Sequence, residues 1–502
     1  MTLSYDLLHE RWIPVRLLDG TFDTVSLAGA LTGAGDIAGL ADAHPMAEVA
    51  TLRLLVAITQ AAIKGPASER ARRELYEAGY PHAAVERYLA EHAGAFDLFH
   101  PTRPFFQDPD LARVMATENG SRSAREQKTP TPASDLGFPL MAASQKILHS
   151  HAHFGSDRHL PPGEAARLLV AYQAWARGGK VQIGGTGRMG VLSGGLVVTP
   201  EGRNLAETLL LCAHAASRLG TPVWEGRPVG WLGRLTWPSR RILLFPDSAS
   251  GLVTSVIIGT GVEPQEKLDE NLNPDPMFAY WPSRTGTRKR VLVQPERATW
   301  RDITALFQAD AQTKAGADVL AEARALLTRT RTGATRMAAV NVYGAHGGAK
   351  KDLPALWVRD RFPLPVEFLE PGSEAVVRLS SRLAEADTID RELLRQLTAA
   401  FQRGNASLTF RRRGYQPAVR PRATYWWALE TPFRVLLADY ARHPRDPIRL
   451  DAADTAWAAA VRTAAKDCFR RATQVIALSP RSGEPLIGAE QALDRCLNKT
   501  FP

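Results

Sequence analysis

The spacing of apolar residues changes near residue 362. Before it, short β-branched runs broken by glycine, such as residues 251–262, predict β-hairpins. Residues 46–63 are apolar around most of a helical circumference and predict a buried helix. After residue 362, apolar residues recur at helical spacing. The pattern predicts an α+β protein, with a large mixed N-terminal domain of β-hairpins and helices over residues 1–362 and a C-terminal four-helix bundle over residues 363–502.

Four segments carry the helical spacing of the C-terminal domain, namely residues 373–386, 388–403, 423–442 and 451–478. The prolines that precede them mark a linker, because proline interrupts both helices and strands. Trp426, Trp427 and Trp457 lie within these segments, and we expect all three in the core of the bundle.

Residues 180–195 contain six glycines in a short segment. Gly185, Gly187 and Gly190 have the G-x-G-x-x-G spacing of a dinucleotide site, which requires the third glycine to open a helix. The chain continues instead with β-branched residues up to Pro200, which predict a strand. The segment therefore predicts an exposed hairpin or loop whose backbone is open to a ligand, while a glycine turn without any ligand is a serious alternative.

Composition agrees with a soluble globular protein, since 45% of the residues are hydrophobic and 23% charged. The formal net charge of +10 comes mostly from arginine and favours a polyanionic partner, although a genome-wide preference for arginine would produce the same bias. Three scattered cysteines exclude a disulfide framework and a cysteine zinc site. We find no signal peptide and no apolar run that would span a bilayer. We therefore expect a cytoplasmic protein that does not bind a membrane.

Two further segments combine positive charge with loop character. Between residues 401 and 425 there are six arginines and no acid, and the patch Arg411, Arg412 and Arg413 predicts contact with nucleic acid or an acidic protein surface. Apolar runs on both sides of residues 347–350 predict a β-hairpin. Its tip consists of Gly347, Gly348, Ala349 and Lys350. Such a tip suits a narrow groove, and an ordinary exposed hairpin end fits equally well.

Four histidines lie close together before the glycine-rich segment, at His149, His151, His153 and His159. The His-x-His spacing occurs among metal ligands, so a metal-dependent nuclease or hydrolase is an alternative function. The H-x-H-x-D-H pattern of zinc hydrolases is not met, and Asp157 is the only nearby carboxylate. A polar recognition loop that includes Arg158 is the preferred interpretation, and no metal is expected.

Seven segments in a fixed order resemble a known family. They are residues 7–16, 46–62, 96–107, the sequence GGTG at 184–187, residues 226–237, residues 275–281 and the terminal helical region. Together they resemble the CasA family, the large subunit of the type I-E CRISPR surveillance complex Cascade, over essentially the whole chain.

The resemblance implies a DNA-recognition subunit of an RNA-guided antiviral defence complex, without catalysis or cofactor. Members of the family read the protospacer-adjacent motif (PAM) of double-stranded DNA from the minor groove, promote duplex opening and R-loop formation, and recruit the Cas helicase-nuclease. The implied partners are PAM-containing DNA, the Cascade subunits that carry the guide RNA, and that nuclease. A monomer is expected in isolation and one copy in each complex.

Carried over by position, the resemblance also implies sites. The PAM glycine loop falls on Gly184, Gly185, Thr186 and Gly187, and the lysine finger on Lys267. The strand wedge falls on Gly347, Gly348, Ala349 and Lys350, where the glutamine usual in the family is missing. The loop that docks on the guide RNA or neighbouring subunits falls on His149, His151, His153, Phe154, Arg158 and His159. Some members carry clustered cysteines for zinc, and this chain has none between Leu243 and Pro282.

Overall fold

The computed structural model divides the chain into two units, each built from two separate stretches of sequence. Residues 1–295 and 311–362 form the mixed unit, and residues 296–310 and 363–502 form the helical unit. The structure describes residues 3–123, 125–137, 158–216, 218–263, 274–281, 287–294, 297–306, 315–329, 339–346, 356–364, 366–370, 372–404, 421–476 and 483–501. Residues 296–310, which the sequence analysis placed in the N-terminal domain, thus group with the C-terminal one.

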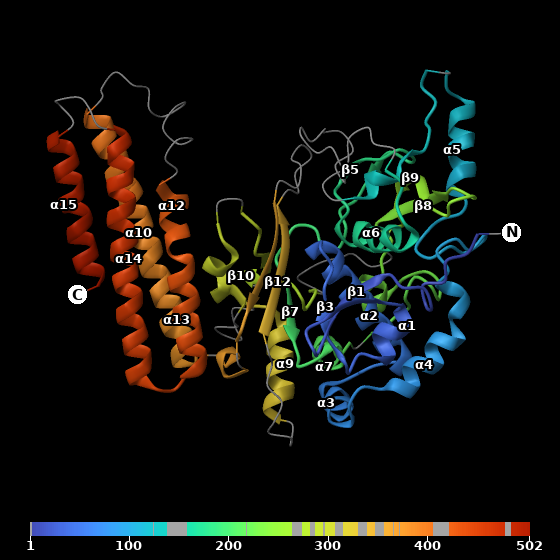
Figure 1. Cartoon of the computed structure of the whole chain (residues 1–502), viewed down its shortest axis with the longest axis horizontal. Helices are drawn as coiled ribbons and strands as arrows, with labels where there is room; N and C mark the ends of the chain where they lie inside the picture. The colour runs from blue at the N-terminus through green and yellow to red at the C-terminus, as the bar shows by residue number, and fades with distance from the viewer. Residues whose placement is uncertain are drawn as a thin grey trace. The chain divides into compact units, whose positions relative to one another are not determined.

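Helix α2, Pro45–Ile63, is the central helix of the mixed unit (Figure 1). Proline in its first turn suits a helix start, and Lys64 ends it in a left-handed conformation at φ 50°. Residues Met46 to Ala61 are buried, as the apolar pattern predicts. The helix is long and apolar enough to cross a membrane by length and composition, but 89% of its most apolar window is buried inside the protein.

Other helices of the mixed unit surround α2 or cover the sheets. They are α1 (Leu27–Thr32), α3 (Glu69–Ala78), α4 (His82–Glu91), α5 (Leu111–Gly120), α6 (Pro162–Trp175), α7 (Leu205–Cys212), α8 (Gly230–Leu235) and α9 (Asp318–Arg329), with the short η1 (Ala93–Ala95) and η2 (Ala133–Leu136). Helices α4, α6, α7 and α8 pack against α2. Residues 69–91 form two helices, α3 and α4, and the short helix α8 precedes β8.

The sheets of the mixed unit are small and antiparallel. Their strand orders are β2-β1-β3, β13-β12-β7 and β4-β9-β8, beside the pairs β5-β6 and β10-β11. The strands are β1 (Ile13–Leu17), β2 (Phe22–Val25), β3 (Ile37–Leu40), β4 (Thr131–Pro132), β5 (Gly179–Lys180), β6 (Thr186–Gly187), β7 (Val197–Glu201), β8 (Arg240–Pro246), β9 (Val253–Thr260), β10 (Tyr280–Trp281), β11 (Lys289–Arg290), β12 (Ala339–His346) and β13 (Leu356–Phe362). The predicted hairpins β8-β9 and β12-β13 are both confirmed.

Long helices lie side by side in the helical unit (Figure 1). They are α10 (Glu374–Gly404), α12 (Pro421–Ala428), α13 (Glu430–Arg442), α14 (Pro447–Ile476) and α15 (Gly483–Thr500), beside η3 (Thr299–Leu306) and η4 (Val366–Leu369). The mixed helix-and-strand fold with a C-terminal helical region is therefore as predicted, but the helix boundaries differ. The two segments expected at 373–403 form one helix, the segment at 423–442 is interrupted at Leu429, and α15 was not predicted.

Of the three tryptophans expected in the bundle core, two are there. Trp457 is 1% exposed and Trp426 is 4% exposed, but Trp427 is 80% exposed. Neighbouring residues on a helix point about 100° apart, because one turn takes 3.6 residues, so Trp426 and Trp427 cannot both face the same core. The prediction for Trp427 is wrong for this reason.

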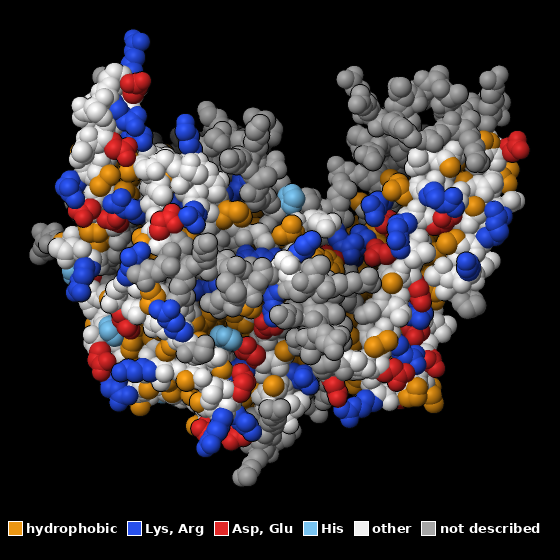
Figure 2. All heavy atoms as spheres, turned by 180° about the vertical axis from the view of Figure 1, so that it is seen from behind, with side chains coloured by type: hydrophobic (Ala, Val, Ile, Leu, Met, Phe, Trp, Pro, Cys, Tyr) orange, Lys and Arg blue, Asp and Glu red, His pale blue; other side chains and the backbone are white. Residues whose placement is uncertain are grey.

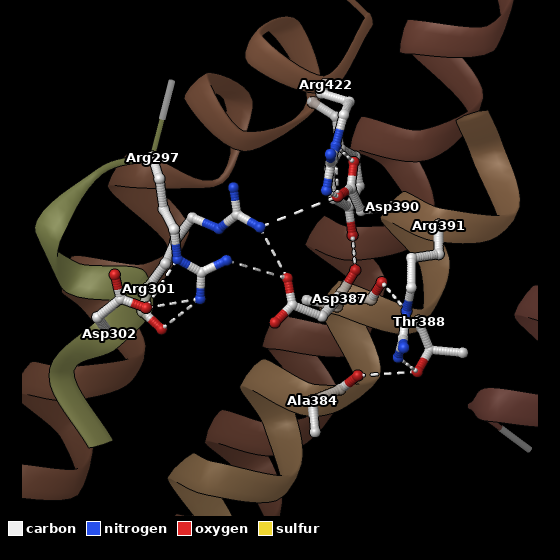
Figure 3. Close-up of polar contacts among 11 residues, drawn as sticks. Arg297, Arg301, Asp302, Ala384, Asp387, Thr388, Asp390, Arg391 and Arg422 are labelled. Carbon is white, nitrogen blue, oxygen red and sulfur yellow. Dashed lines mark hydrogen bonds and ion pairs between the residues drawn. The ribbon is translucent and has the colours of Figure 1, made fainter. Parts of the chain in front are cut away.

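A network of charged residues that includes the buried Asp390, Arg301 and Asp302 joins η3 to the bundle (Figure 3). We call it the η3 network, and it comprises Arg297, Arg301, Asp302, Asp387, Asp390 and Arg422. Asp390 is fully buried, and Arg422 donates to its Oδ2 from Nε at 2.9 Å and from Nη2 at 2.6 Å. Arg301 donates to Asp387 at 2.7 Å and lies 3.9 Å from Asp390.

Aromatic packing completes the attachment of η3. The ring of Trp300 stacks on Phe433 of α13 with centroids 4.3 Å apart, and the guanidinium of Arg301 lies 3.4 Å from the ring centroid of Trp426. Trp300 is fully buried. The segment is therefore part of the core of the helical unit, although its neighbours in sequence belong to the mixed unit.

Candidate nucleic-acid interface

The glycine-rich segment forms a small hairpin. Strands β5 and β6 pair antiparallel, with Gly179 opposite Gly187 and Lys180 opposite Thr186, and the N–H of Val181 donates to the carbonyl of Gly185 at 2.9 Å. A hairpin is confirmed here, but its second strand is β6 and not the expected strand that leads to Pro200. The later strand β7 pairs instead with β12 in another sheet.

No helix opens at the third glycine of the G-x-G-x-x-G spacing. The N–H of Gly190 donates to the carbonyl of Ala176, just after α6, at 2.6 Å. A Cβ atom at position 190 would lie 2.7 Å from the carbonyl carbon of Ala174, so only glycine permits this approach. Gly190 serves close packing on α6, and the arrangement lacks the helix N-terminus of a dinucleotide site.

The turn of the hairpin, residues 181–185, lies against the edge of β9. The side chain of Gln182 accepts the N–H of Ile258 at 3.0 Å, and its backbone N–H donates to the carbonyl of Ile258 at 3.1 Å. The N–H of Thr260 donates to the carbonyl of Ile183 at 2.9 Å. Hydrogen bonds from both backbone and side chain therefore fix the base of the turn on a sheet, while its tip extends beyond the sheet edge.

The four residues predicted as a glycine loop divide into a surface group and a buried residue. Gly184, Gly185 and Thr186 are exposed, and Gly187 is buried. Gly184 and Gly185 have φ angles of 82° and 96°, a region that side chains rarely allow. A Cβ at Gly184 would lie 2.9 Å from Thr260 Oγ1, whereas nothing lies within 4 Å of a Cβ at Gly185. The backbone at Gly185 consequently faces open space, which we take as the tip of a candidate probe.

Charged side chains flank the turn. Lys180 and Arg188 are exposed, and Arg188 pairs with Glu263 at 2.8 Å. Lys128 lies 3.1 Å from Glu118. The pKa of the Glu118 carboxyl is lowered, chiefly by the hydrogen bond from Lys128. Desolvation opposes this shift, whereas the charge of Lys128 and a hydrogen bond from the N–H of Gly184 add to it. Exposed ion pairs of this kind contribute little to stability, so their cations can exchange partners for phosphate at small cost.

The charged side chains of the described residues do not form one continuous positive patch on the face drawn in Figure 2. On the face drawn in Figure 2, lysine and arginine side chains are interspersed with aspartate and glutamate in the part of the chain that is coloured by type. The net charge alone therefore does not locate a nucleic-acid surface. The patch Arg411, Arg412 and Arg413 lies outside the described residues.

Several other predicted site residues also lie outside the described residues. They are His149, His151, His153, Phe154, Lys267, Gly347, Gly348, Ala349 and Lys350. Of the predicted docking loop, the structure describes Arg158 and His159. Arg158 donates to Glu164 on α6 at 2.6 Å, and His159 is exposed. Within the described ranges, no group of three or more His, Cys, Asp or Glu side chains is arranged to hold a metal ion.

Sequence reasoning missed Arg240, the first residue of β8, which packs beneath Gly187. A Cβ at Gly187 would lie 2.7 Å from Nε of Arg240. A signal for it is present in the sequence. Residues of a strand alternate between two faces, and Arg240 has the same parity as the buried Ile242 and Leu244. That alternation places the arginine on the buried face.

Comparisons with known proteins agree with the fold. The family model described as CRISPR-associated protein Cse1 matches residues 6–468. The CRISPR-associated protein CasA/Cse1 of Thermus thermophilus is 27% identical over 527 residues, covering 99% of this chain and 98% of that protein.

Solved structures share the same fold. Thermus thermophilus CasA (Cse1) matches with a TM-score of 0.78 and 24% identity over 99% of each chain. Thermobifida fusca Cse1 matches with a TM-score of 0.77 and 23% identity over 99% of this chain and 98% of that one. A chain of a CRISPR RNA-guided surveillance complex matches with a TM-score of 0.72 and 20% identity over 99% and 100%. Since the family model covers most of the sequence, the chain belongs to the CRISPR-associated Cse1 family.

Proposed function

We propose that this chain is the DNA-recognition subunit of an RNA-guided surveillance complex of the Cascade type, and that the exposed residues Gly184, Gly185 and Thr186, at the end of the turn and the start of β6, read the PAM from the minor groove. Membership of the Cse1 family and the fold shared with a chain of a CRISPR RNA-guided surveillance complex support the setting. The observation that carries the site is the backbone at Gly185, which faces open space at φ 96° from a base fixed on β9.

The physics of the minor groove favours such a probe. The groove is only about 6 Å wide, so backbone without side chains enters where bulky residues would not. Its base edges distinguish mainly A·T from G·C pairs, so the reading is degenerate and several PAM sequences should be accepted. An unfavourable base pair then costs roughly 1–3 kcal/mol. The identity of the target is left to guide pairing.

Other parts of the chain have proposed roles in the same process. In this proposal Lys267 supports PAM reading, the hairpin tip at Gly347, Gly348, Ala349 and Lys350 separates the strands, and residues 149–159 dock on the guide RNA or a neighbouring subunit. Arg411, Arg412 and Arg413 contact nucleic acid or an acidic protein surface. Duplex opening, R-loop formation and recruitment of the Cas helicase-nuclease follow, in the cytoplasm, with no catalytic step in this subunit.

A binding experiment tests the glycine turn. The measurement is a gel-shift titration of Cascade reconstituted around this chain, on targets that differ only in the flanking trinucleotide. We expect Gly185→Asp to abolish the preference for the favoured trinucleotide, because the added carboxylate faces the DNA acceptors and phosphates. Gly20→Asp is the matched control, since Gly20 also has a positive φ, 89°, with nothing within 4 Å of its Cβ position. If both variants retain the preference, the turn does not read the PAM.

A further inference from the structure

One buried arginine lies directly beneath the candidate turn. Arg240 begins β8 and is 2% exposed. Its guanidinium faces the Cα atom of Gly187, where a Cβ would lie 2.7 Å from Nε and 2.8 Å from Nη1. Any side chain at position 187 would therefore collide with the guanidinium. Gly187 is needed for this contact, unlike Gly184 and Gly185, which are needed for their positive φ angles.

The guanidinium of Arg240 binds both ends of the hairpin. Its Nη1 donates to the carbonyl of Arg188, which follows β6, and to that of Ser239 at 2.7 Å. Its Nη2 donates to the carbonyl of Arg177, which precedes β5. A single planar group thus connects the chain entering the hairpin to the chain leaving it.

Arg240 is itself held by helix α6. The backbone N–H of Arg240 donates to Oε1 of Gln173 at 2.9 Å, and Nε2 of Gln173 donates to the carbonyl of Arg240 at 2.9 Å. Ser239 Oγ donates to the carbonyl of Gln173 at 2.7 Å. Since α6 packs on the central helix α2, the support under the turn reaches the core of the mixed unit.

The contacts of Arg240 are unusual for a buried cation. Its hydrogen-bond partners are backbone carbonyls, and in the part of the chain that the structure describes no carboxylate lies within ion-pair distance of it. Burial lowers the pKa of Arg240, and interaction with Tyr172 opposes this shift, but an arginine stays protonated in proteins. Among the described residues, the positive charge below the turn therefore has no acidic partner.

We infer that Arg240 is a positioning residue for PAM reading: it fixes both ends of the β5-β6 hairpin from below, so that the exposed turn meets the minor groove of duplex DNA in one orientation. This role rests on the proposed function of the turn. It requires the fork of the guanidinium as well as its charge, because only a planar group with several donors spans the three carbonyls at once. Lysine carries the same charge on one flexible ammonium.

The test separates discrimination from binding. Arg240→Lys and Arg240→Gln are assembled into reconstituted Cascade, and affinities are measured for two duplex targets, one with the preferred flanking trinucleotide and one without. We expect the ratio of the two affinities to fall at least about tenfold in both variants, the equivalent of one base pair's discrimination. Affinity for the non-preferred target and assembly of the complex should stay as in the unaltered protein.

The control is Arg241→Lys. Arg241 is the next residue of β8, but its Nε pairs with Asp108 at 2.5 Å, and among the described residues its side chain makes no hydrogen bond or ion pair with the hairpin. This variant should leave the affinity ratio unchanged. If Arg240→Gln does not fold, the ratio is measured on Arg240→Lys and on Gly187→Ala, whose new methyl group displaces the guanidinium from the other side.

The outcomes separate the positioning role of Arg240 from the proposed DNA-reading function of the turn. If Gly185→Asp abolishes discrimination while Arg240→Lys and Gly187→Ala preserve it, the positioning role is overturned and the proposed function stands. If Gly185→Asp preserves discrimination, the proposed function itself fails. If the Arg240 variants lower both affinities equally, Arg240 contributes only to general DNA binding, and the inference is likewise overturned.

Discussion

Arg240 in the mixed unit and Arg301 in the helical unit are both buried, at 2% and 6% exposed, yet their surroundings differ in charge. Arg301 donates to Asp387 at 2.7 Å and lies 3.9 Å from Asp390, with the Trp426 ring against its guanidinium. Arg240 is bound by the carbonyls of residues 177, 188 and 239. The aspartates neutralise one arginine, and carbonyl dipoles only partly compensate the other.

The difference indicates two uses of the same side chain. In the helical unit, the buried Arg301 joins η3 to Asp387 and Asp390 of α10. In the mixed unit, arginine holds both ends of a surface hairpin through backbone carbonyls. A buried cation without a carboxylate is costly to maintain, so its presence under an exposed turn suggests function more strongly than the η3 network does.

The largest expected effect is on the η3 network. Asp390→Ala removes the buried partner that Arg301 and Arg422 share and should lower the free energy of unfolding by about 2–3 kcal/mol, because Arg301 keeps Asp387 and the Arg422 side chain is 50% exposed. Denaturation in guanidinium chloride, followed by tryptophan fluorescence, measures this free energy, because Trp300 and Trp426 lie close to the substituted residue. Asp451→Ala is the control, because Asp451 pairs with Arg378 but its side chain is 69% exposed. That variant should cost less than about 1 kcal/mol. Equal losses of unfolding free energy in the two variants would show that burial of the aspartate does not determine how much it stabilises the protein.

A second expected effect depends on pH and concerns the buried pair Arg53 and Asp275 of the mixed unit, with Nη2–Oδ2 at 2.9 Å. Burial raises the pKa of Asp275, but the charges of Arg53 and Arg234 and the hydrogen bonds it accepts outweigh burial and lower that pKa to about 2. Because the folded pKa is depressed, this stabilisation is present above the ordinary value of 3.8 and is lost as the pH falls through 2.

The destabilisation caused by Asp275→Asn should accordingly shrink by about 2 kcal/mol between pH 5 and pH 2, since one pKa unit corresponds to about 1.4 kcal/mol. Unfolding titrations of both proteins across this range measure the difference. Arg240→Met should show no such change, because no carboxylate pairs with Arg240 among the described residues. A parallel pH dependence in Arg240→Met would contradict the contrast between the two kinds of buried arginine.

The third effect is the stability cost of removing Arg240 itself. Arg240→Met should cost about 1–2 kcal/mol, the lower part of the range for leaving buried polar groups unsatisfied. The reason is that Arg188 is exposed and Arg177 half-buried, so water can reach their carbonyls. Urea denaturation at pH 7 measures it. A cost as large as that of Asp390→Ala would mean that Arg240 stabilises the whole unit and not chiefly the hairpin.

The smallest effect concerns the turn. Gly185→Ala and Gly20→Ala should each cost about 1 kcal/mol, because alanine is strained at positive φ and neither site has neighbours to collide with. Only Gly185→Ala should also weaken PAM discrimination in the gel-shift titration. If the two variants lose the same free energy of unfolding and also show the same PAM discrimination, the turn at Gly185 has no DNA-reading role that the turn at Gly20 lacks.

The sequence predicted those elements correctly whose structure follows from the residues within the element itself. Helix α2 follows from continuous apolar character, and the β12-β13 hairpin follows from two apolar runs around a small-residue tip. The exposed glycines were also recognisable, since clusters of glycine mark backbone in unusual conformations. These features depend on residues close together in the chain.

What could not be predicted depends on contacts between distant residues. Gly187 needs to be glycine because of Arg240, which belongs to another strand and is far away in sequence. The grouping of Trp300 and Arg301 with the C-terminal helices depends on Asp387 and Phe433, which no local pattern near η3 reveals. The error for Trp427 is of another kind, because the helical period alone shows that the adjacent Trp426 and Trp427 cannot both face one core.

The membership of η3 in the helical unit has a consequence for dividing this protein into fragments. Because residues 296–310 and 363–502 form one unit, the chain passes between the two units three times. A fragment beginning at residue 363 would lack Trp300 and Arg301, so Phe433 would lose the ring stacked on it and the buried Asp390 would keep only Arg422 as a charged partner. Cutting the chain once before α10 would therefore not release an intact helical unit, and a self-sufficient fragment must supply η3 as a separate or fused peptide.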